Sequence, residues 1–408
     1  MSILKSAALA ASIALGLAGH ATAADLRLNA ATATDQVPTR LSAAKDDRAA
    51  AALDRTPVQV SWALDPAEAL TDRPTPFVQE SREYWLNASE AELQRGVALP
   101  TTAEAALIRI SPHGNNSSRL GIDDLVISGN GRQLSGREAT QSLADEAALR
   151  AAGMDVSEGT VIAKLAPGTG KGNLRLSAPA ARGDYLIHVF EPTSSTVLRL
   201  GAARDTVVAG QSVRITANLH GAKASSAKGM LTAPDGHSQA FELSLQADGS
   251  WQADIVPDAT HAGGPALWEV HAFASGGDAR APVLRDAKTA LAVSRASARL
   301  SGEVSTALDG ARGKGLSVDV GVETASASRY QLAGVLYGTA TDGARRPAAY
   351  AQSATWLATG AGKLTLTFDA QALAGSKLSA PYELRDLRLS NQADMSVVER
   401  RERALEIR

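Results

Sequence analysis

The sequence of 408 residues contains no cysteine. This absence excludes disulfide bonds, thiol catalysis and zinc sites built from thiolates. Without such cross-links the fold has to be stabilised by core burial alone, which domains of roughly 100–200 residues achieve. The chain is long enough for two or three domains of that size.

Aromatic residues are also scarce, at 4% of the chain, and the formal net charge is only −2. So few aromatic rings argue against a broad stacking platform for sugars. A nucleic-acid-binding protein needs a concentrated basic footprint, so a nearly neutral chain disfavours nucleic acid as a partner.

Long apolar runs are missing, and the run at residues 7–18 is too short to span a membrane, which takes about 20 residues. Lys5 precedes this run and Ala21-Thr22-Ala23 follows it, the pattern of a cleavable signal peptide. We therefore expect removal of residues 1–23, no membrane span in the mature chain, and a periplasmic or secreted location. A buried N-terminal helix is the alternative interpretation.

Two stretches of different character follow the predicted signal peptide. Residues 24–55 are rich in Ala, Thr, Asp and Arg without clear periodicity, which predicts a flexible N-terminal arm. A helix over residues 42–53 is the alternative, because alanine and charged residues favour helices. Residues 56–200 mix alternating segments with helix signals and predict a β-rich domain with two short helices.

Alternation and helix caps locate the elements of that β-rich domain. Residues 58–62, Val-Gln-Val-Ser-Trp, alternate as in a half-buried strand. The pairs Ser89 with Glu92 and Ser135 with Glu138 form capping boxes, in which each side chain bonds the other residue's backbone N–H group. The first helix is expected to end at Gly96, and the second to run to Gly153.

The remaining two segments, residues 201–295 and 296–408, are almost purely β in pattern. Apolar and polar residues alternate over residues 213–217 and again over residues 316–322, with turns rich in Gly and Asp between the strands. The charged stretch at residues 395–408 is predicted to be a strand, with a helix as the alternative. The expected fold class is mainly β, with tandem immunoglobulin-like β-sandwich domains after the N-terminal β-rich domain.

Familiar motifs of catalysis and metal binding are missing. The histidines are isolated from one another in the sequence, and no His-x-His, His-Glu-x-x-His or Gly-x-Ser-x-Gly motif occurs. We therefore predict no catalytic residue, no metal site and no cofactor. A triad assembled from distant loops stays open, because such triads follow no fixed spacing.

One polar loop contains candidate binding residues. Residues 111–124 include His113, Asn115, Asp123 and Asp124, whose oxygen and nitrogen atoms suit a polar ligand or a calcium ion. The ordinary polarity of a surface loop explains this composition equally well.

An adjacent aromatic pair, Tyr84 and Trp85, provides the other candidate binding residues. Two neighbouring rings can stack on a sugar, and the alternative is one ring in the core and one at its rim.

Segments in both halves of the chain carry a family resemblance. They are Glu83-Tyr84-Trp85, Ala91-Glu92-Leu93, Gly96-Val97 and residues 106–112, and, further along the chain, residues 330–337, 348–350 and 381–387. Together they resemble an exported bacterial family known as domain of unknown function 4785, over most of the mature chain. The resemblance implies β-rich domains with immunoglobulin-like parts and an exported location. It supplies no catalytic residue.

These observations predict an exported, non-catalytic binding protein of the bacterial envelope or secretome. Such a protein presents loops or strand edges to a protein or glycan partner, although fold alone does not give function. Two other functions stay open. One is a secreted hydrolase with its site in residues 56–200, around His113, Asp123 and Asp124, and the other is a structural spacer in an envelope assembly.

Overall fold

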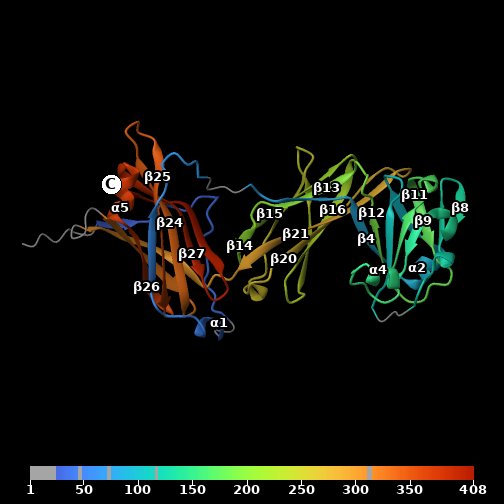
Figure 1. Cartoon of the computed structure of the whole chain (residues 1–408), viewed down its shortest axis with the longest axis horizontal. Coiled ribbons are helices and arrows are strands. Elements are labelled where there is room, and N and C mark those ends of the chain that lie inside the picture. Colours follow the sequence, from blue (N-terminus) through green and yellow to red (C-terminus); the bar gives the residue numbers. More distant parts are fainter. Residues whose placement is uncertain (1–23, 45–47, 71–74, 115–117, 310–314) are drawn as a thin grey trace, which may run out of the picture.

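The computed structural model describes residues 24–44, 48–70, 75–114, 118–309 and 315–408. The predicted signal peptide lies outside these residues. As predicted, the described chain is mainly β, and it forms three bodies in a row (Figure 1). We call them the terminal body, which contains the C-terminus, the middle body and the distal body. Among the described residues, no helix is long and apolar enough to cross a membrane.

The terminal body is a sandwich of two antiparallel sheets. The first sheet has the strand order β1 (Ala24–Arg27), β22 (Ala298–Asp309), β23 (Gly315–Thr324) and β26 (Gly360–Phe368). The second has the order β2 (Val58–Ala63), β25 (Arg345–Leu357), β24 (Ser328–Thr339), β27 (Ser379–Asn391) and β28 (Ser396–Ile407). Two short helices, α1 (Arg48–Ala51) and α5 (Ala370–Ser376), accompany them. β28 confirms the strand predicted for the charged C-terminal stretch.

The N-terminal residues complete both sheets of the terminal body. β1 pairs with β22, with Ala24 opposite Thr306, and β2 pairs with β25, with Val58 opposite Ala354. The sequence predicted a flexible arm over residues 24–55 and placed the strand at residues 58–62 in the next domain. The structure differs on both points, because the pairing partners lie in the last third of the chain, beyond the reach of local periodicity.

The middle body is a second sandwich. One of its sheets has the order β18 (Ser244–Leu245), β19 (Trp251–Ile255), β15 (Val213–His220), β13 (Val197–Ala202) and β3 (Val78–Ser81). The facing strands are β17 (Ser238–Glu242), β16 (Ala224–Thr232), β20 (Trp268–Gly277) and β21 (Pro282–Ser294), and β14 (Thr206–Val208) runs parallel to β21. The short 3-10 helix η3 (Ala259–His261) connects β19 to β20.

The distal body continues the same sheet. Beyond β21 the order is β4 (Glu83–Ala88), β12 (Tyr185–Phe190), β6 (Leu107–Pro112), β10 (Val161–Leu165) and β9 (Thr140–Ala144). A smaller sheet of β5 (Val97–Thr101), β11 (Gly172–Ser177), β7 (Val126–Gly129) and β8 (Arg132–Ser135) covers it. Three short helices, α2 (Glu90–Arg95), α3 (Gly136–Ala139) and α4 (Glu146–Ala151), and the 3-10 turns η1 (Ile122–Asp124) and η2 (Pro167–Thr169) lie between the strands.

The helices of the distal body follow their predicted caps in part. Both capping boxes are present, at Ser89 and at Ser135, and α2 ends at Gly96 as predicted. The prediction of one helix from Ser135 to Gly153 was wrong. α3 ends after one turn, because residues 140–144 pair with β10 as strand β9, and α4 begins at a separate cap, Asp145.

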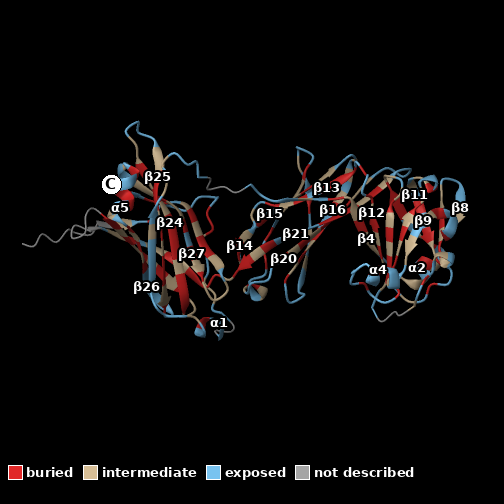
Figure 2. Cartoon of the chain, in the orientation of Figure 1, coloured by how far each residue is buried: buried red, intermediate tan, exposed pale blue. Residues whose placement is uncertain are grey.

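Each body has its own core, and buried residues run along the strands in all three (Figure 2). The alternation of the sequence produces this pattern, because successive side chains of a strand point to opposite faces of its sheet. The middle and distal bodies share one continuous sheet, since Asp286 of β21 lies opposite Glu83 of β4. Figure 1 shows the three bodies as one elongated particle, with both ends of the described chain in the terminal body.

Candidate functional site

The predicted aromatic pair does not form one surface. Tyr84 and Trp85 point to opposite faces of β4, and the Tyr84 side chain is buried. Its hydroxyl donates a hydrogen bond to the backbone oxygen of Pro100 at 2.8 Å, and burial raises its pKa well above the ordinary value. Tyr84 is therefore a core residue of the distal body and Trp85 is half-buried at its rim, as in the alternative interpretation of this pair.

Trp85 instead stacks on a histidine. Its ring lies 4.0 Å from that of His188 on the neighbouring strand β12, with an angle of 12° between the planes. His188 Nε2 lies 2.9 Å from Glu83 Oε2, and this hydrogen bond lowers the pKa of the Glu83 carboxyl. The half-buried group of three side chains stabilises the β4–β12 pair near the junction with the middle body.

The polar loop residues are engaged with neighbours inside the distal body. Asp123 accepts two hydrogen bonds from the Arg137 guanidinium, at 2.5 and 2.6 Å, which lower its pKa. Asp124 Oδ2 accepts from the backbone N–H of Gly121 at 2.7 Å. His113 is exposed after β6, and within the described residues no hydrogen bond joins it to either aspartate.

Asn115, the other predicted residue of this loop, lies outside the described residues. The described part of the loop brings together neither a calcium-binding set of oxygen atoms nor a catalytic pair. A binding role for His113, Asn115, Asp123 and Asp124 stays a prediction.

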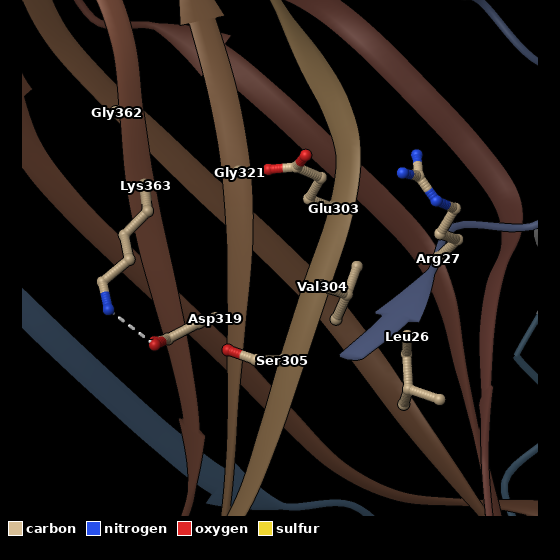
Figure 3. A pocket seen from close by; sticks show the side chains of 9 residues that line it. All are labelled: Leu26, Arg27, Glu303, Val304, Ser305, Asp319, Gly321, Gly362 and Lys363. Atoms are coloured by element: carbon tan, nitrogen blue, oxygen red, sulfur yellow. Dashed lines mark hydrogen bonds and ion pairs between the residues drawn. The ribbon is translucent and has the colours of Figure 1, made fainter. Parts of the chain in front are cut away.

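A shallow pocket of about 450 Å³ opens on the outer face of the first sheet of the terminal body (Figure 3). Its charged lining residues are Arg27, Glu303, Asp319 and Lys363. Lys363 Nζ lies 2.7 Å from Asp319 Oδ2, and Asp319 Oδ1 accepts from Thr365 Oγ1 at 2.6 Å. The Asp319 carboxylate in this pocket is therefore already paired with Lys363 and bonded to Thr365, while Arg27 and Glu303 line the pocket beside it.

The edge of the other sheet is different, because it exposes apolar side chains in a row. β2 is the last strand of its sheet within the described residues. Val58, Val60 and Trp62 are 43%, 41% and 48% exposed, and they share the outer face of the strand. Its sequence, Val-Gln-Val-Ser-Trp-Ala, contains neither a charge nor a proline. Natural edge strands usually carry charged residues or proline, which discourage pairing with another chain.

Aromatic residues of β25 extend this row. The Tyr350 ring lies 4.5 Å from that of Trp62, tilted by 33°, and the Arg55 guanidinium lies 4.2 Å above the Trp356 ring. Tyr350 and Trp356 point to the same face as Trp62, because they are an even number of residues apart on β25 and Tyr350 lies opposite Trp62. We call Val58, Val60, Trp62, Tyr350 and Trp356 the outer strip.

The inner side of β2 explains why its apolar side chains face outwards. Gln59 Nε2 donates to the backbone oxygen of Thr365 on β26, and Ser61 Oγ donates to Asp369 Oδ2 at 2.7 Å. These polar side chains close the corner between the two sheets, which turns Val58, Val60 and Trp62 towards solvent. The alternation of this strand was predictable from the sequence, but alternation alone does not say which face is buried.

Comparison with known proteins gives a consistent assignment. The sequence-family model described as "Domain of unknown function (DUF4785) N-terminal domain" matches residues 49–191. The family model of the DUF4785 C-terminal domain matches residues 297–408. A crystal structure of a DUF4785 family protein from Legionella pneumophila is 22% identical in sequence, with a TM-score of 0.70. The match covers 91% of this chain and 99% of that chain, and supports the fold.

Other comparisons add little. A tetra-tandem repeat from the extending region of a large adhesion protein is 12% identical over 73% of each chain, with a TM-score of 0.17 that carries no argument. No curated protein matches the sequence.

Proposed function

The chain belongs to the DUF4785 family, and we propose that it is an exported binding protein that captures an extended segment of a partner protein along β2. The uncharged, exposed edge strand of the terminal body carries this proposal. Export is motivated by the signal-peptide pattern in residues 1–23. The family itself has no described activity that can be transferred to this chain.

Strand addition explains why β2 is an edge strand and also exposes a row of apolar side chains. An added strand would bond to the outward-facing N–H and C=O groups of β2, which provide affinity independent of sequence. Alternate side chains of the added strand would then lie beside Val58, Val60 and Trp62, since side chains on one face recur every second residue. Burial of these apolar groups contributes about 25 cal/mol per Å².

The outer strip favours a polypeptide over a glycan. A sugar ring stacks best on one open aromatic face, whereas Trp62 and Tyr350 are tilted against each other by 33°. The strip is also long and narrow, with valines in the middle, which suits the side chains of an extended peptide. A glycan partner is therefore one of the outcomes that the experiment has to separate.

Site-specific photo-crosslinking tests the proposal. A photoreactive amino acid replaces Val60 in the full-length protein, in a host that exports it, and crosslinked proteins are identified by mass spectrometry. We expect one partner, linked through a short extended segment. A synthetic peptide of that segment should bind the purified protein, and Val60→Lys should weaken binding at least about tenfold, because it places a charge in the contact.

The control uses another exposed apolar residue on an edge strand. Leu245 on β18 is 54% exposed and lies in the middle body. A photoreactive group at position 245 should not trap the same partner, and Leu245→Lys should leave peptide binding unchanged. The proposal fails if position 60 traps nothing specific, or if Val60→Lys binds as tightly as the unaltered protein. Glycan binding lost in Trp62→Ala would assign a sugar partner instead.

A spacer function is the second candidate, and the continuous sheet of the middle and distal bodies favours it. A spacer holds its neighbours at a fixed distance and does not depend on the outer strip. Stable co-purification with one envelope protein that is unaffected by Val60→Lys would support the spacer.

A further inference from the structure

Two histidines that are far apart in the sequence meet at one end of the middle body. His237 lies in the turn between β16 and β17, and His261 lies at the end of η3. Their rings stack with centroids 3.9 Å apart and an angle of 3° between the planes. In the sequence these histidines are isolated and form no metal motif. Only the fold brings their two loops together.

Carboxylates accompany both histidines. Asp258, the cap of η3, offers a ligand atom that lies within 4.8 Å of the ligand atoms of His237 and His261. Asp258 Oδ1 accepts hydrogen bonds from the backbone N–H and the hydroxyl of Thr260, both at 2.8 Å. Oδ2 takes no part in these two bonds and is available as a ligand.

Asp235 fixes the orientation of His261. Its Oδ2 lies 2.6 Å from His261 Nδ1, while its Oδ1 accepts from the backbone N–H of His237. A histidine whose Nδ1–H group donates to a carboxylate keeps a lone pair on Nε2. This carboxylate–histidine arrangement recurs behind metal-bound histidines, where it sets the tautomer and raises the basicity of the ligand. Asp235 would therefore support the site from behind His261.

We propose that His237, His261 and Asp258 bind a divalent transition-metal ion of the Zn²⁺ type, with Asp235 as the residue that positions His261. Two imidazoles and a carboxylate are ligands that Zn²⁺ accepts, with one position left for water. Zn²⁺ bonds of about 2.0–2.2 Å require ligand atoms roughly 3.3 Å apart. The distances between the three ligand atoms therefore have to shorten by about 1.5 Å at most. His237 and Asp258 are exposed, so side-chain rotation can bring the stacked rings to a common point.

The site joins two loops next to the terminal body. The metal would link the β16–β17 turn to the β19–β20 connection. The backbone oxygen of Ala262, beside His261, accepts a hydrogen bond from Arg295 in the segment that leads into the terminal body. A bound ion would thus stabilise the end of the middle body that faces the terminal body. This proposal is independent of the outer strip on β2.

Metal titration of the full mature chain tests the site. In calorimetry at neutral pH, we expect one Zn²⁺ per chain. Bound Co²⁺ should show the visible absorption of a four-coordinate site. His237→Ala and His261→Ala should each weaken Zn²⁺ binding at least tenfold, and Asp235→Ala about 10–100-fold, as for other residues behind a metal ligand. Asp258→Asn should also weaken binding while it keeps the cap of η3, because asparagine caps helices as well as aspartate does.

Two controls separate binding from folding. His220→Ala removes an exposed histidine at the end of β15 and should leave Zn²⁺ binding unchanged. The melting temperature of the metal-free variants should match that of the unaltered chain, while only the unaltered chain should gain stability from added Zn²⁺. The proposal is overturned if the unaltered chain binds no Zn²⁺, if it prefers Ca²⁺, or if the His237→Ala/His261→Ala double variant binds Zn²⁺ equally well.

Discussion

Arg285 of β21 and Glu191, which follows β12, form an ion pair of 2.6 Å in which neither side chain is exposed. The pair lies at the junction of the middle and distal bodies. Arg285 Nε also donates to the backbone oxygen of Thr196 at 3.0 Å, and Glu191 Oε1 accepts the backbone N–H groups of Thr102 and Ala103. Several partners for each charge offset the high cost of removing both from water.

Breaking this pair should destabilise the protein strongly. Arg285→Met leaves the Glu191 carboxylate buried without its cation, and we expect the free energy of unfolding to fall by about 3–5 kcal/mol. The double variant Arg285→Met/Glu191→Leu removes both charges and should lose less than Arg285→Met alone. Urea unfolding followed by circular dichroism measures all three proteins.

An exposed pair supplies the matched control. Arg214 and Asp254 form a bidentate ion pair on the surface of the middle body, at 2.8 and 2.9 Å. Arg214→Met should change the unfolding curve little, because exposed pairs are well solvated. Equal losses for Arg285→Met and Arg214→Met would contradict the assignment of the buried pair as the link between the bodies.

The Glu83–His188 contact should make stability depend on acid pH. The hydrogen bond from His188 lowers the pKa of Glu83 below its ordinary value of 4.5. A lowered pKa means that the contribution is present above pH 4.5 and is lost as the pH falls through the folded-state pKa. Glu83→Gln should therefore lose less stability than the unaltered protein on acidification below pH 4.5. The difference should stay under about 1 kcal/mol, because the pair is half exposed.

Melting temperatures between about pH 3 and pH 7 measure this effect. The two curves should run closest together at the acid end, where Glu83 is protonated in both the folded and the unfolded protein. Curves that stay parallel over the whole range would show that Glu83 contributes nothing to the pH dependence.

The aromatic ring opposite Gly229 leaves no room for a larger residue at this position. It lies on β16 opposite Phe241 of β17, and a Cβ atom at this position would lie 2.1 Å from the ring. Gly229→Ala should lower the free energy of unfolding by about 1–3 kcal/mol, because the ring has to move in a packed edge. Gly229→Ala/Phe241→Ala should recover part of the stability lost in Phe241→Ala alone, as measured by urea unfolding.

Gly168 provides the comparison for this substitution. It lies in η2, and a Cβ atom there would meet no other atom within 4 Å. Gly168→Ala should be nearly neutral. If Gly229→Ala proved equally neutral, the ring would be free to turn away, and Phe241 would not restrict this position.

Local chemistry in the sequence was sufficient for elements that depend on neighbouring residues. The Ser89–Glu92 capping box predicted the start of α2, because both partners lie within one helical turn. The charged C-terminal stretch was predicted as a strand from its apolar residues, of which Val398, Leu405 and Ile407 lie in the core. The helix expected up to Gly153 failed because pairing with β10, a contact from later in the chain, takes residues 140–144 into a sheet.

The candidate sites depended on long-range contacts and were not predictable in this way. The alternation of Val58, Val60 and Trp62 fits a strand with either face buried. The bonds of Gln59 to β26 and of Ser61 to the residue just before α5 determine which face is turned inwards. Likewise, the meeting of the His237 and His261 loops follows from the order of strands in the middle body, which no short motif encodes.

The terminal body gives the sharpest test of this long-range assembly. A fragment of residues 297–408 contains every strand matched by the C-terminal family model but lacks β1 and β2. It leaves β22 and β25 as open edges and removes Leu28, which packs in the core. We expect this fragment to aggregate or to melt without cooperativity, because unpaired edges and exposed core surface favour association.

Joining residues 24–63 to the same fragment through a flexible linker should restore a cooperative transition. The matched control carries Leu28→Asp in the joined segment, which places a charge in the core and should abolish the rescue. A fragment of residues 297–408 that melted cooperatively at the temperature of the joined protein would show that the sandwich needs neither N-terminal strand. The N-terminal residues would then be an attachment to the terminal body, and Val58, Val60 and Trp62 of the outer strip would lie on a dispensable strand.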